Sequence, residues 1–179
     1  MTLREAIIEF AEREIGTTEF PAGSNRVKYN DWYYPVGHDY FRVSIPWHWC
    51  GTFVSYIYHY ASQHLDVSNP LYDLPNRPNG VTELGFHYVP TFDNWAKKHG
   101  KTTLNPKEGD IVLFDWNKDG LEDHTGIFVK WHNSNQFWCI EGNTSDSNKG
   151  SQSNGGGVYL RLRHKSLVSS FVNVIDDEL

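Results

Sequence analysis

The chain has 179 residues and carries 16 basic side chains against 22 acidic ones, a formal net charge of −6. This length suits one domain, so we expect residues 1–179 to form a single folding unit. The acidic balance, without a cluster of Lys and Arg, argues against nucleic acid as the main partner. The sequence also has no apolar stretch long enough to insert across a membrane.

The first expected element is an amphipathic helix over residues 2–15. Its apolar side chains recur among charged ones, Thr2 is a suitable N-cap, and Gly16 stops the helix. The segment lacks the continuous apolar core of a signal peptide. Three interpretations stay open: the protein remains in the cytoplasm, it leaves by a route that reads no signal, or it was cut from a longer chain.

Two more helices are expected in the first hundred residues. Residues 50–63 place apolar side chains at the three- and four-residue spacing of a buried helix, and a short helix is expected over 91–99. The segment between the first two helices, residues 17–49, is rich in aromatic side chains. It is too long for an ordinary connection, and long loops in compact domains are usually functional.

The pattern then changes to the alternation of strands. Strands are expected at residues 111–114, 124–131, 136–142 and 157–162, with turns rich in Asp, Asn, Gly and Ser between them. Helices followed by antiparallel strands indicate an α+β fold, in which the N-terminal helices pack on a C-terminal antiparallel sheet.

Cys50 is a candidate nucleophile because it stands where the second helix begins. The unpaired N–H groups and the positive end of a helix dipole stabilise a thiolate, the reactive form of cysteine. We expect the adjacent Gly51 to let a substrate carbonyl approach closely. The alternative is that Cys50 is only a small buried residue, and Cys139, inside an apolar strand, is interpreted in that way. Two cysteines do not make a disulfide framework.

His124 is the candidate base for this cysteine, because it opens a strand directly after an acidic turn. If the turn between the next two strands is centred near residues 133 and 134, His124 faces Asn143. Glu141 then lies one diagonal step away on the same sheet face, within side-chain reach. A slip of one residue would separate these groups. The alternative is that Glu141 and Asn143 are surface residues beside a turn.

Four segments in this order resemble the CHAP family, the cysteine, histidine-dependent amidohydrolases/peptidases. They are WCGTFVS at 49–55, KEGDIVLF at 107–114, DHTGI at 123–127 and IEGN at 140–143. The resemblance covers about residues 5–163 and implies a papain-like fold. It implies that Cys50 is the nucleophile, that His124 is the base, that Glu141 orients the imidazole and that Asn143 is an auxiliary polar group.

The resemblance also implies a function. CHAP proteins are peptidoglycan hydrolases common in phage endolysins and autolysins, so the expected reaction is cleavage of a stem-peptide amide bond, by an N-acetylmuramoyl-L-alanine amidase or an endopeptidase. The expected partners are peptidoglycan and a separate wall-binding module or subunit. An endolysin would stay cytoplasmic until holin-type lysis releases it, or would act outside the cell on the wall. The alternatives are a calcium-stabilised binding module with a vestigial Cys/His pair, and a papain-like amidase with a non-wall substrate.

Many family members have Gln where this chain has Trp49, so no side chain is assigned to the oxyanion hole. Aromatic residues crowd the segment before Cys50, and about half of them are expected in the core. Trp47, Trp49 and Trp138 are expected to line a groove that contacts sugar rings and stem peptides.

Residues 115–123, just before His124, match the first nine positions of an EF-hand-type calcium loop. The twelfth position is Gly126 and supplies no bidentate carboxylate. The alternative is a turn held by its own side chains. Because some CHAP domains bind calcium, we expect a structural Ca²⁺ that braces the turn. Its predicted ligands are Asp115, Asn117, Asp119, the Leu121 carbonyl and Asp123.

Overall fold

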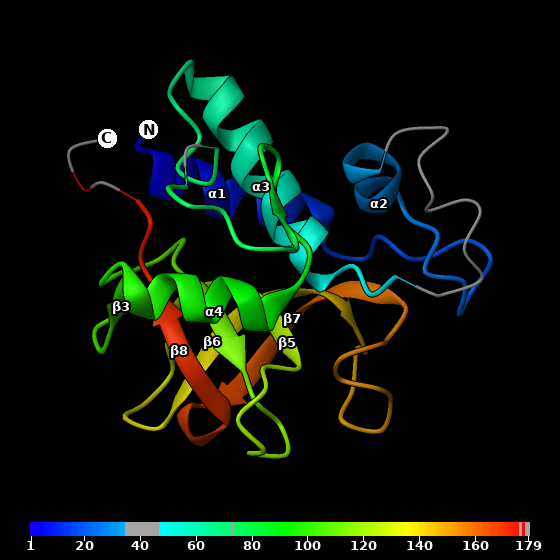
Figure 1. Ribbon diagram of the computed structural model, residues 1–179. Coiled ribbons are helices and arrows are strands. Elements are labelled where there is room, and N and C mark those ends of the chain that lie inside the picture. Colours follow the sequence, from blue (N-terminus) through cyan, green and yellow to red (C-terminus); the bar gives the residue numbers. More distant parts are fainter. Residues whose placement is uncertain (35–46, 73, 176, 178–179) are drawn as a thin grey trace.

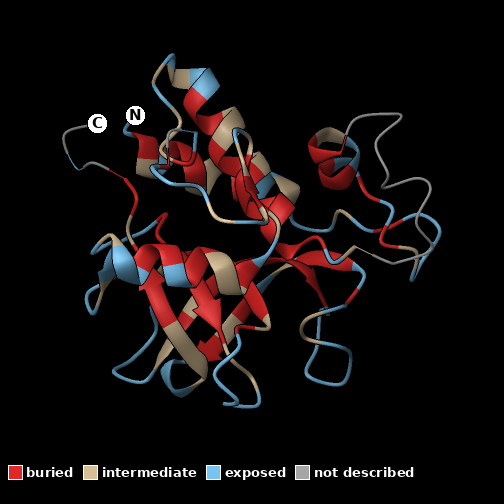
Figure 2. Cartoon of the chain, viewed as in Figure 1, coloured by how far each residue is buried: buried red, intermediate tan, exposed pale blue. Residues whose placement is uncertain are grey.

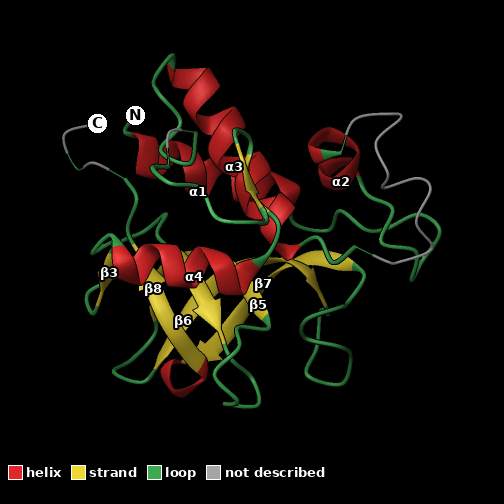
Figure 3. Cartoon of the chain, in the orientation of Figure 1, coloured by secondary structure: helices red, strands yellow, loops and turns green. Residues whose placement is uncertain are grey.

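The computed structural model describes residues 1–34, 47–72, 74–175 and 177, with helices α1 and α3 on one side of an antiparallel sheet (Figure 1 and Figure 3). The helices are α1 (Leu3–Glu14), α2 (Lys28–Tyr33), α3 (Cys50–Leu65) and α4 (Val89–Lys98), with a 3-10 turn, η2, at Lys165–Leu167. The strands are β1 (Val81–Thr82), β2 (Gly85–Phe86), β3 (Thr102–Thr103), β4 (Ile111–Phe114), β5 (His124–Trp131), β6 (Gln136–Thr144), β7 (Gly157–His164) and β8 (Val168–Val172). The predicted α+β fold, with helices before the sheet, is confirmed.

Helix α1 begins as predicted. The Thr2 hydroxyl accepts a hydrogen bond from the backbone N–H of Glu5, and the Glu5 carboxylate accepts one from the backbone N–H of Thr2. This capping box satisfies donors that the first turn cannot pair by itself. The buried side chains of α1, Ile7 among them, belong to the same apolar core as α3, and the two helices lie in contact.

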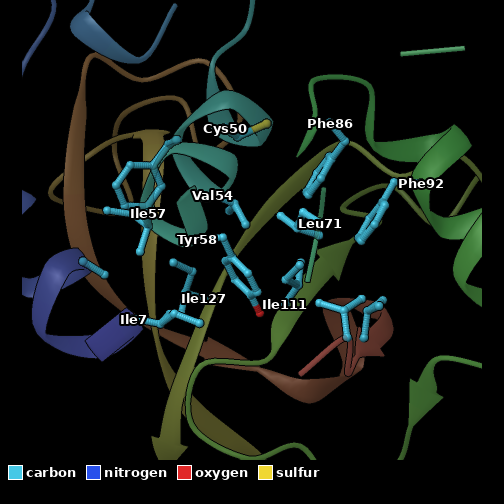
Figure 4. Close-up of a cluster of buried hydrophobic side chains, with 14 of the residues drawn as sticks. Ile7, Cys50, Val54, Ile57, Tyr58, Leu71, Phe86, Phe92, Ile111 and Ile127 are labelled. Carbon is cyan, nitrogen blue, oxygen red and sulfur yellow. The ribbon is translucent and has the colours of Figure 1, made fainter. Parts of the chain in front are cut away.

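Helix α3 is the central helix of this core. It starts at Cys50, as predicted, and continues two residues beyond the predicted end, to Leu65. Val54, Ile57 and Tyr58 point from it toward the sheet, and Cys50 lies at its N-terminal end (Figure 4). The helix is buried along most of its length (Figure 2). A largely buried, apolar helix of this kind fixes the position of its first residue against the sheet.

The main sheet positions the candidate base. Within the described residues it has six antiparallel strands in the order β3-β8-β4-β5-β6-β7. The predicted register of β5 and β6 is confirmed at the two pairs nearest the site, Ile127 with Ile140 and Phe128 with Cys139. Farther along, between Phe128 and Lys130, a bulge shifts the pairing by one residue, on the side of these two pairs that lies away from His124.

Both faces of the sheet are buried. On β4, Ile111 and Leu113 face the core that contains α1 and α3, whereas Val112 and Phe114 face a second apolar cluster. This second cluster also contains Phe128, Phe137, Cys139 and Phe171. Because side chains alternate along a strand, His124 and Glu141 lie on the face of the second cluster. The short elements α2, β1, β2, β3 and β8 lie outside the sequence-based expectations.

Candidate active site

Cys50 is the first residue of α3. The residue before it, Trp49, is held in the core and fixes the point at which the helix begins. Cys50 is 3% exposed and Trp49 is fully buried. The indole Nε1–H of Trp49 donates to Glu19 at 2.8 Å, and the ring stacks on Tyr29 with 5.4 Å between centroids. The expectation that Trp49 lines a substrate groove is therefore corrected: its ring is a core anchor for the start of α3. Both cysteines are free thiols.

Two glycines allow the start of α3 to approach its neighbours closely. A Cβ atom at Gly142 on β6 would lie 2.6 Å from Phe53 Cβ and 2.8 Å from Trp49 Cζ3. A Cβ atom at Gly51 would lie 3.0 Å from the carbonyl oxygen of Phe86. The space beside Gly51 is therefore filled by the backbone of Phe86 and His87, just before α4. This corrects the expectation that a substrate carbonyl approaches there. The close approach at Gly142 brings the first turn of α3 against the end of β6.

His124 and Glu141 meet at this end of the sheet. Both are fully buried, and His124 Nε2 lies 3.8 Å from Glu141 Oε2. This separation is an ion-pair contact, because it is too long for a hydrogen bond. Gly126 makes it attainable, since a Cβ there would lie 2.7 Å from Glu141 Cγ and 2.6 Å from Cys139 Sγ. The structure thus brings His124 and Glu141 together as the predicted register requires.

The electrostatics of the site link His124 to Cys50. Burial acts to lower the pKa of His124, but its interactions with Cys50 and Glu141 outweigh burial and raise this pKa to about 9. Burial acts to raise the pKa of Glu141, but His124 and Arg163 together lower it. The pKa of His48, two residues before Cys50, is lowered by burial and by the nearby His124. An imidazolium beside an ionised carboxylate is therefore the favoured state at neutral pH.

Arg163 is a member of this site that the sequence did not indicate. It is 5% exposed, and its Nε and Nη2 atoms donate to the Glu141 carboxylate at 2.5–3.0 Å. The signal available in the sequence is the alternation of Arg161 and Arg163 with apolar residues in β7, which places both guanidinium groups on one face of the strand.

Asn143 lies next to this cluster but bonds elsewhere. It is fully buried, it has a positive φ of 58°, and its Nδ2–H donates to the Ser153 carbonyl at 3.5 Å. Its Oδ1 has no hydrogen-bond partner among the described residues. The structure therefore places Asn143 under the loop of residues 145–156, and its auxiliary role stays a prediction.

The remaining predicted tryptophans lie apart. Trp138 is two residues from Ile140 on β6, so both side chains project from the same face of the sheet, opposite to Glu141. This corrects the expectation that Trp138 lies beside the site. Its ring contacts His132, with 5.9 Å between centroids. Trp47 is half-buried against Tyr34 and His87. The backbone of His87 lies beside Gly51, the neighbour of Cys50. Trp47 contacts His87, so of the three predicted groove residues it is the one that remains a candidate near Cys50.

The loop before His124 is held by its own side chains. The Asp115 carboxylate accepts hydrogen bonds from the backbone N–H groups of Asp119 and Gly120, at 3.2 and 2.9 Å. Asp123 Oδ2 accepts one from the backbone N–H of Trp116 at 2.7 Å and closes the loop. In the described part of the chain, no three acidic, His or Cys side chains converge as a metal site. Calcium binding by this loop stays a prediction, and no catalytic step depends on it.

Comparison with known proteins identifies the family. The CHAP domain matches residues 40–143, which is more than half of the chain and includes Cys50, His124 and Glu141. The chain belongs to the CHAP family. CHAP domains are cysteine, histidine-dependent amidohydrolases or peptidases, and the grouping of a thiol, an imidazole and a carboxylate is consistent with that chemistry. No curated protein matches the chain. No helix in the described part of this CHAP protein is long and apolar enough to span a bilayer.

Proposed function

We propose that this CHAP protein is a peptidoglycan hydrolase that cleaves an amide bond of the cell-wall stem peptide through a cysteine nucleophile. The observation that supports this most strongly is the buried grouping of Cys50, His124 and Glu141, in which Cys50 and Glu141 raise the pKa of the imidazole to about 9. An imidazolium beside a cysteine favours the thiolate, which is the nucleophilic form.

The proposed reaction is acyl transfer in two stages. The Cys50 thiolate attacks the carbonyl carbon of the amide, a C–S bond forms, and negative charge moves to the carbonyl oxygen. The C–N bond then breaks, and the leaving nitrogen takes a proton from the His124 imidazolium. Neutral His124 next removes a proton from water, whose oxygen attacks the thioester carbon. The C–S bond breaks, the acid product leaves, and the Cys50 thiolate and the His124 imidazolium are restored.

Glu141 and the start of α3 have supporting roles in this scheme. The Glu141 carboxylate, 3.8 Å from His124 Nε2, favours the imidazolium and sets the orientation of the ring. The backbone N–H of Cys50 is the proposed donor to the oxyanion, because the first N–H groups of a helix have no partner within the helix. Trp47 is proposed to contact the substrate, since it lies beside the backbone that packs on Gly51.

Targeting to the wall is proposed to come from a separate module or subunit. The chain has a net charge of −6, and the walls of Gram-positive bacteria are anionic, so long-range attraction does not favour binding. An endolysin that acts on the wall after release from the cytoplasm is the context we propose for this activity.

The test is digestion of purified peptidoglycan by the chain and by Cys50→Ala, with mass spectrometry of the released fragments. New amine and carboxyl termini with the native chain, and none with C50A, are the expected result, and the masses identify the bond. Cys139→Ala is the matched control, because this second buried cysteine lies outside the proposed reaction. Equal release of termini by C50A would overturn the cysteine mechanism. An absence of new termini with the native chain would favour a binding module or a non-wall amidase.

A further inference from the structure

The buried carboxylate of Glu141 is shared between two cations. Its Oε2 atom lies 3.8 Å from His124 Nε2 and 2.5 Å from Arg163 Nη2. Arg163 Nε donates to both carboxylate oxygens, at 2.9 and 3.0 Å. The Arg163 guanidinium therefore binds the Glu141 carboxylate through several hydrogen bonds, whereas the His124 imidazole makes one ion-pair contact with it. Such multiple contacts fix the plane of a carboxylate, which a single contact does not.

The other donors of Arg163 hold it in place. Nη1 donates to Gln152 Oε1 at 2.8 Å, and Nη2 donates to Thr144 Oγ1 at 3.3 Å. The guanidinium carbon lies 4.9 Å from the centroid of the Trp116 ring, whose face it covers. The Trp116 ring also stacks on His124, with 5.7 Å between centroids. Arg163 and His124 are thus placed by the same indole and by the same carboxylate.

We propose that Arg163 is a positioning residue of this CHAP site: it keeps Glu141 ionised and aligned toward His124. This proposal rests on the proposed role of Glu141. Its physical basis is the cost of burying a carboxylate: with one of its two cations removed, Glu141 takes up a proton more readily. A neutral Glu141 could not favour the imidazolium. As the pH falls, the thiolate–imidazolium pair would then be lost at a higher pH than in the native chain.

The charged and titratable groups that act on Glu141 or on His124 come from several elements. Those that act on Glu141 are His124 on β5, Cys139 on β6, and Arg161 and Arg163 on β7; those that act on His124 also include Cys50 on α3 and His48 just before it. Of the two arginines, Arg161 supplies a matched control. It is 6% exposed and bonds to the same loop, through the Ser145 carbonyl and Asn148 Oδ1, but not to Glu141.

The test measures the rate of Cys50 alkylation by iodoacetamide against pH, with C50A as the blank. This readout needs no wall substrate, so it can fail independently of the proposed function. In Arg163→Met we expect the acidic midpoint of the profile to move up by about one to three pH units. In Arg161→Met we expect a clearly smaller movement, because Arg161 acts on Glu141 through its charge alone and donates its hydrogen bonds to Ser145 and Asn148. With any cleavable substrate, R163M should lower kcat more than it raises KM.

Arg163→Lys completes the series and covers the case in which R163M does not fold. Lysine keeps the charge but replaces the parallel hydrogen bonds by a single contact. The acidic midpoint of alkylation in R163K should therefore lie above that of the native chain. Where R163M folds, the midpoint of R163K should lie below that of R163M. Native-like midpoints in R163M or R163K would overturn the proposal. Equal shifts in R161M and R163M would also overturn it, because they would assign the effect to the shared loop.

Discussion

In the proposed mechanism, His124 is the side chain whose protonation most directly controls the reaction. It is fully buried, yet its pKa is raised to about 9, because the interactions with Cys50 and Glu141 outweigh the burial that lowers it. An imidazolium is needed to protonate the leaving nitrogen. The proton must therefore stay on the ring through the neutral range for the enzyme to work there.

Amide hydrolysis is accordingly expected to persist up to about pH 9 and to fall above it, as the imidazolium loses its proton. The measurement is kcat/KM against pH. Glu141→Gln removes the negative charge beside His124, so the alkaline limb of its residual activity should move to lower pH. A native alkaline limb near the ordinary histidine pKa of about 6.5 would contradict the assignment.

Gly126→Ala is expected to disturb Glu141 directly. The new Cβ would lie 2.7 Å from Glu141 Cγ and 2.6 Å from Cys139 Sγ, so one or both must move, at a cost of about 1–3 kcal/mol in stability. Hydrolysis should fall at least tenfold, a loss of about 1.4 kcal/mol in transition-state stabilisation. Gly156→Ala is the control, because nothing lies within 4 Å of its Cβ position. Urea unfolding and kcat measure the two effects, and native kcat in G126A would contradict the expectation.

Residue type and spacing in the sequence are sufficient to nominate Cys50, His124 and Glu141. Arg163 escapes such reasoning because its partner Glu141 lies on a different strand, and the contact depends on the register of β6 and β7. The buried position of Trp49 could not be predicted for a different reason. An aromatic ring beside a nucleophile suits a groove or a core equally well, and its buried partner Glu19 is thirty positions away in the sequence.

At the scale of elements, the register of β5 and β6 is predictable because a short turn and two apolar strands define it. The bulge between Phe128 and Lys130 lies beyond such reasoning, since it is an irregularity of pairing and not of sequence pattern. Strand β8 contains two adjacent serines and follows a short 3-10 turn, and α2 is six residues long. Elements this short have weak periodicity, and their packing decides their conformation.

The loop of residues 115–123 carries the prediction on calcium. If it binds Ca²⁺, the melting temperature should rise with added Ca²⁺, because a ligand at one hundred times its Kd stabilises the fold by about 2.7 kcal/mol. Asp115→Asn combined with Asp119→Asn should abolish the rise, and Asp146→Asn, in another exposed loop, should keep it. No rise with Ca²⁺, together with full activity in a chelator, would show that the loop is only a self-bonded turn.

At the scale of the whole molecule, Arg4 ties the first helix to the end of the chain. Its guanidinium contacts the buried Asp110 carboxylate at 2.8 Å, the Asn173 side chain at 3.2 Å and Asp177 at 3.0 Å. Asp110 precedes β4, whose strand neighbours are β5 and β8. One side chain of α1 therefore joins the helical part to the sheet and to the C-terminal segment.

Arg4→Met is expected to lower the free energy of unfolding by about 3–5 kcal/mol, because it leaves the buried Asp110 carboxylate without its cation. Adding Asp110→Asn should recover part of this loss. On the same helix, Arg13→Met removes an exposed pair with Glu9 and should cost less than about 1 kcal/mol. Urea unfolding gives all three values, and equal losses for R4M and R13M would contradict the assigned role.

The close approach of α3 and β6 at Gly142 has a consequence for biosynthesis. The thiol belongs to the first third of the chain, whereas the imidazole and its carboxylate come from strands made much later. A ribosome builds the chain from its N-terminus, so Cys50 is synthesised long before His124 and Glu141. By the proposed mechanism, the nascent protein would therefore have no hydrolytic activity. The same division makes the chain a candidate for a split reporter. Two fragments, divided between α3 and β4, would each be inert, and activity would return only when they reassociate across Gly142.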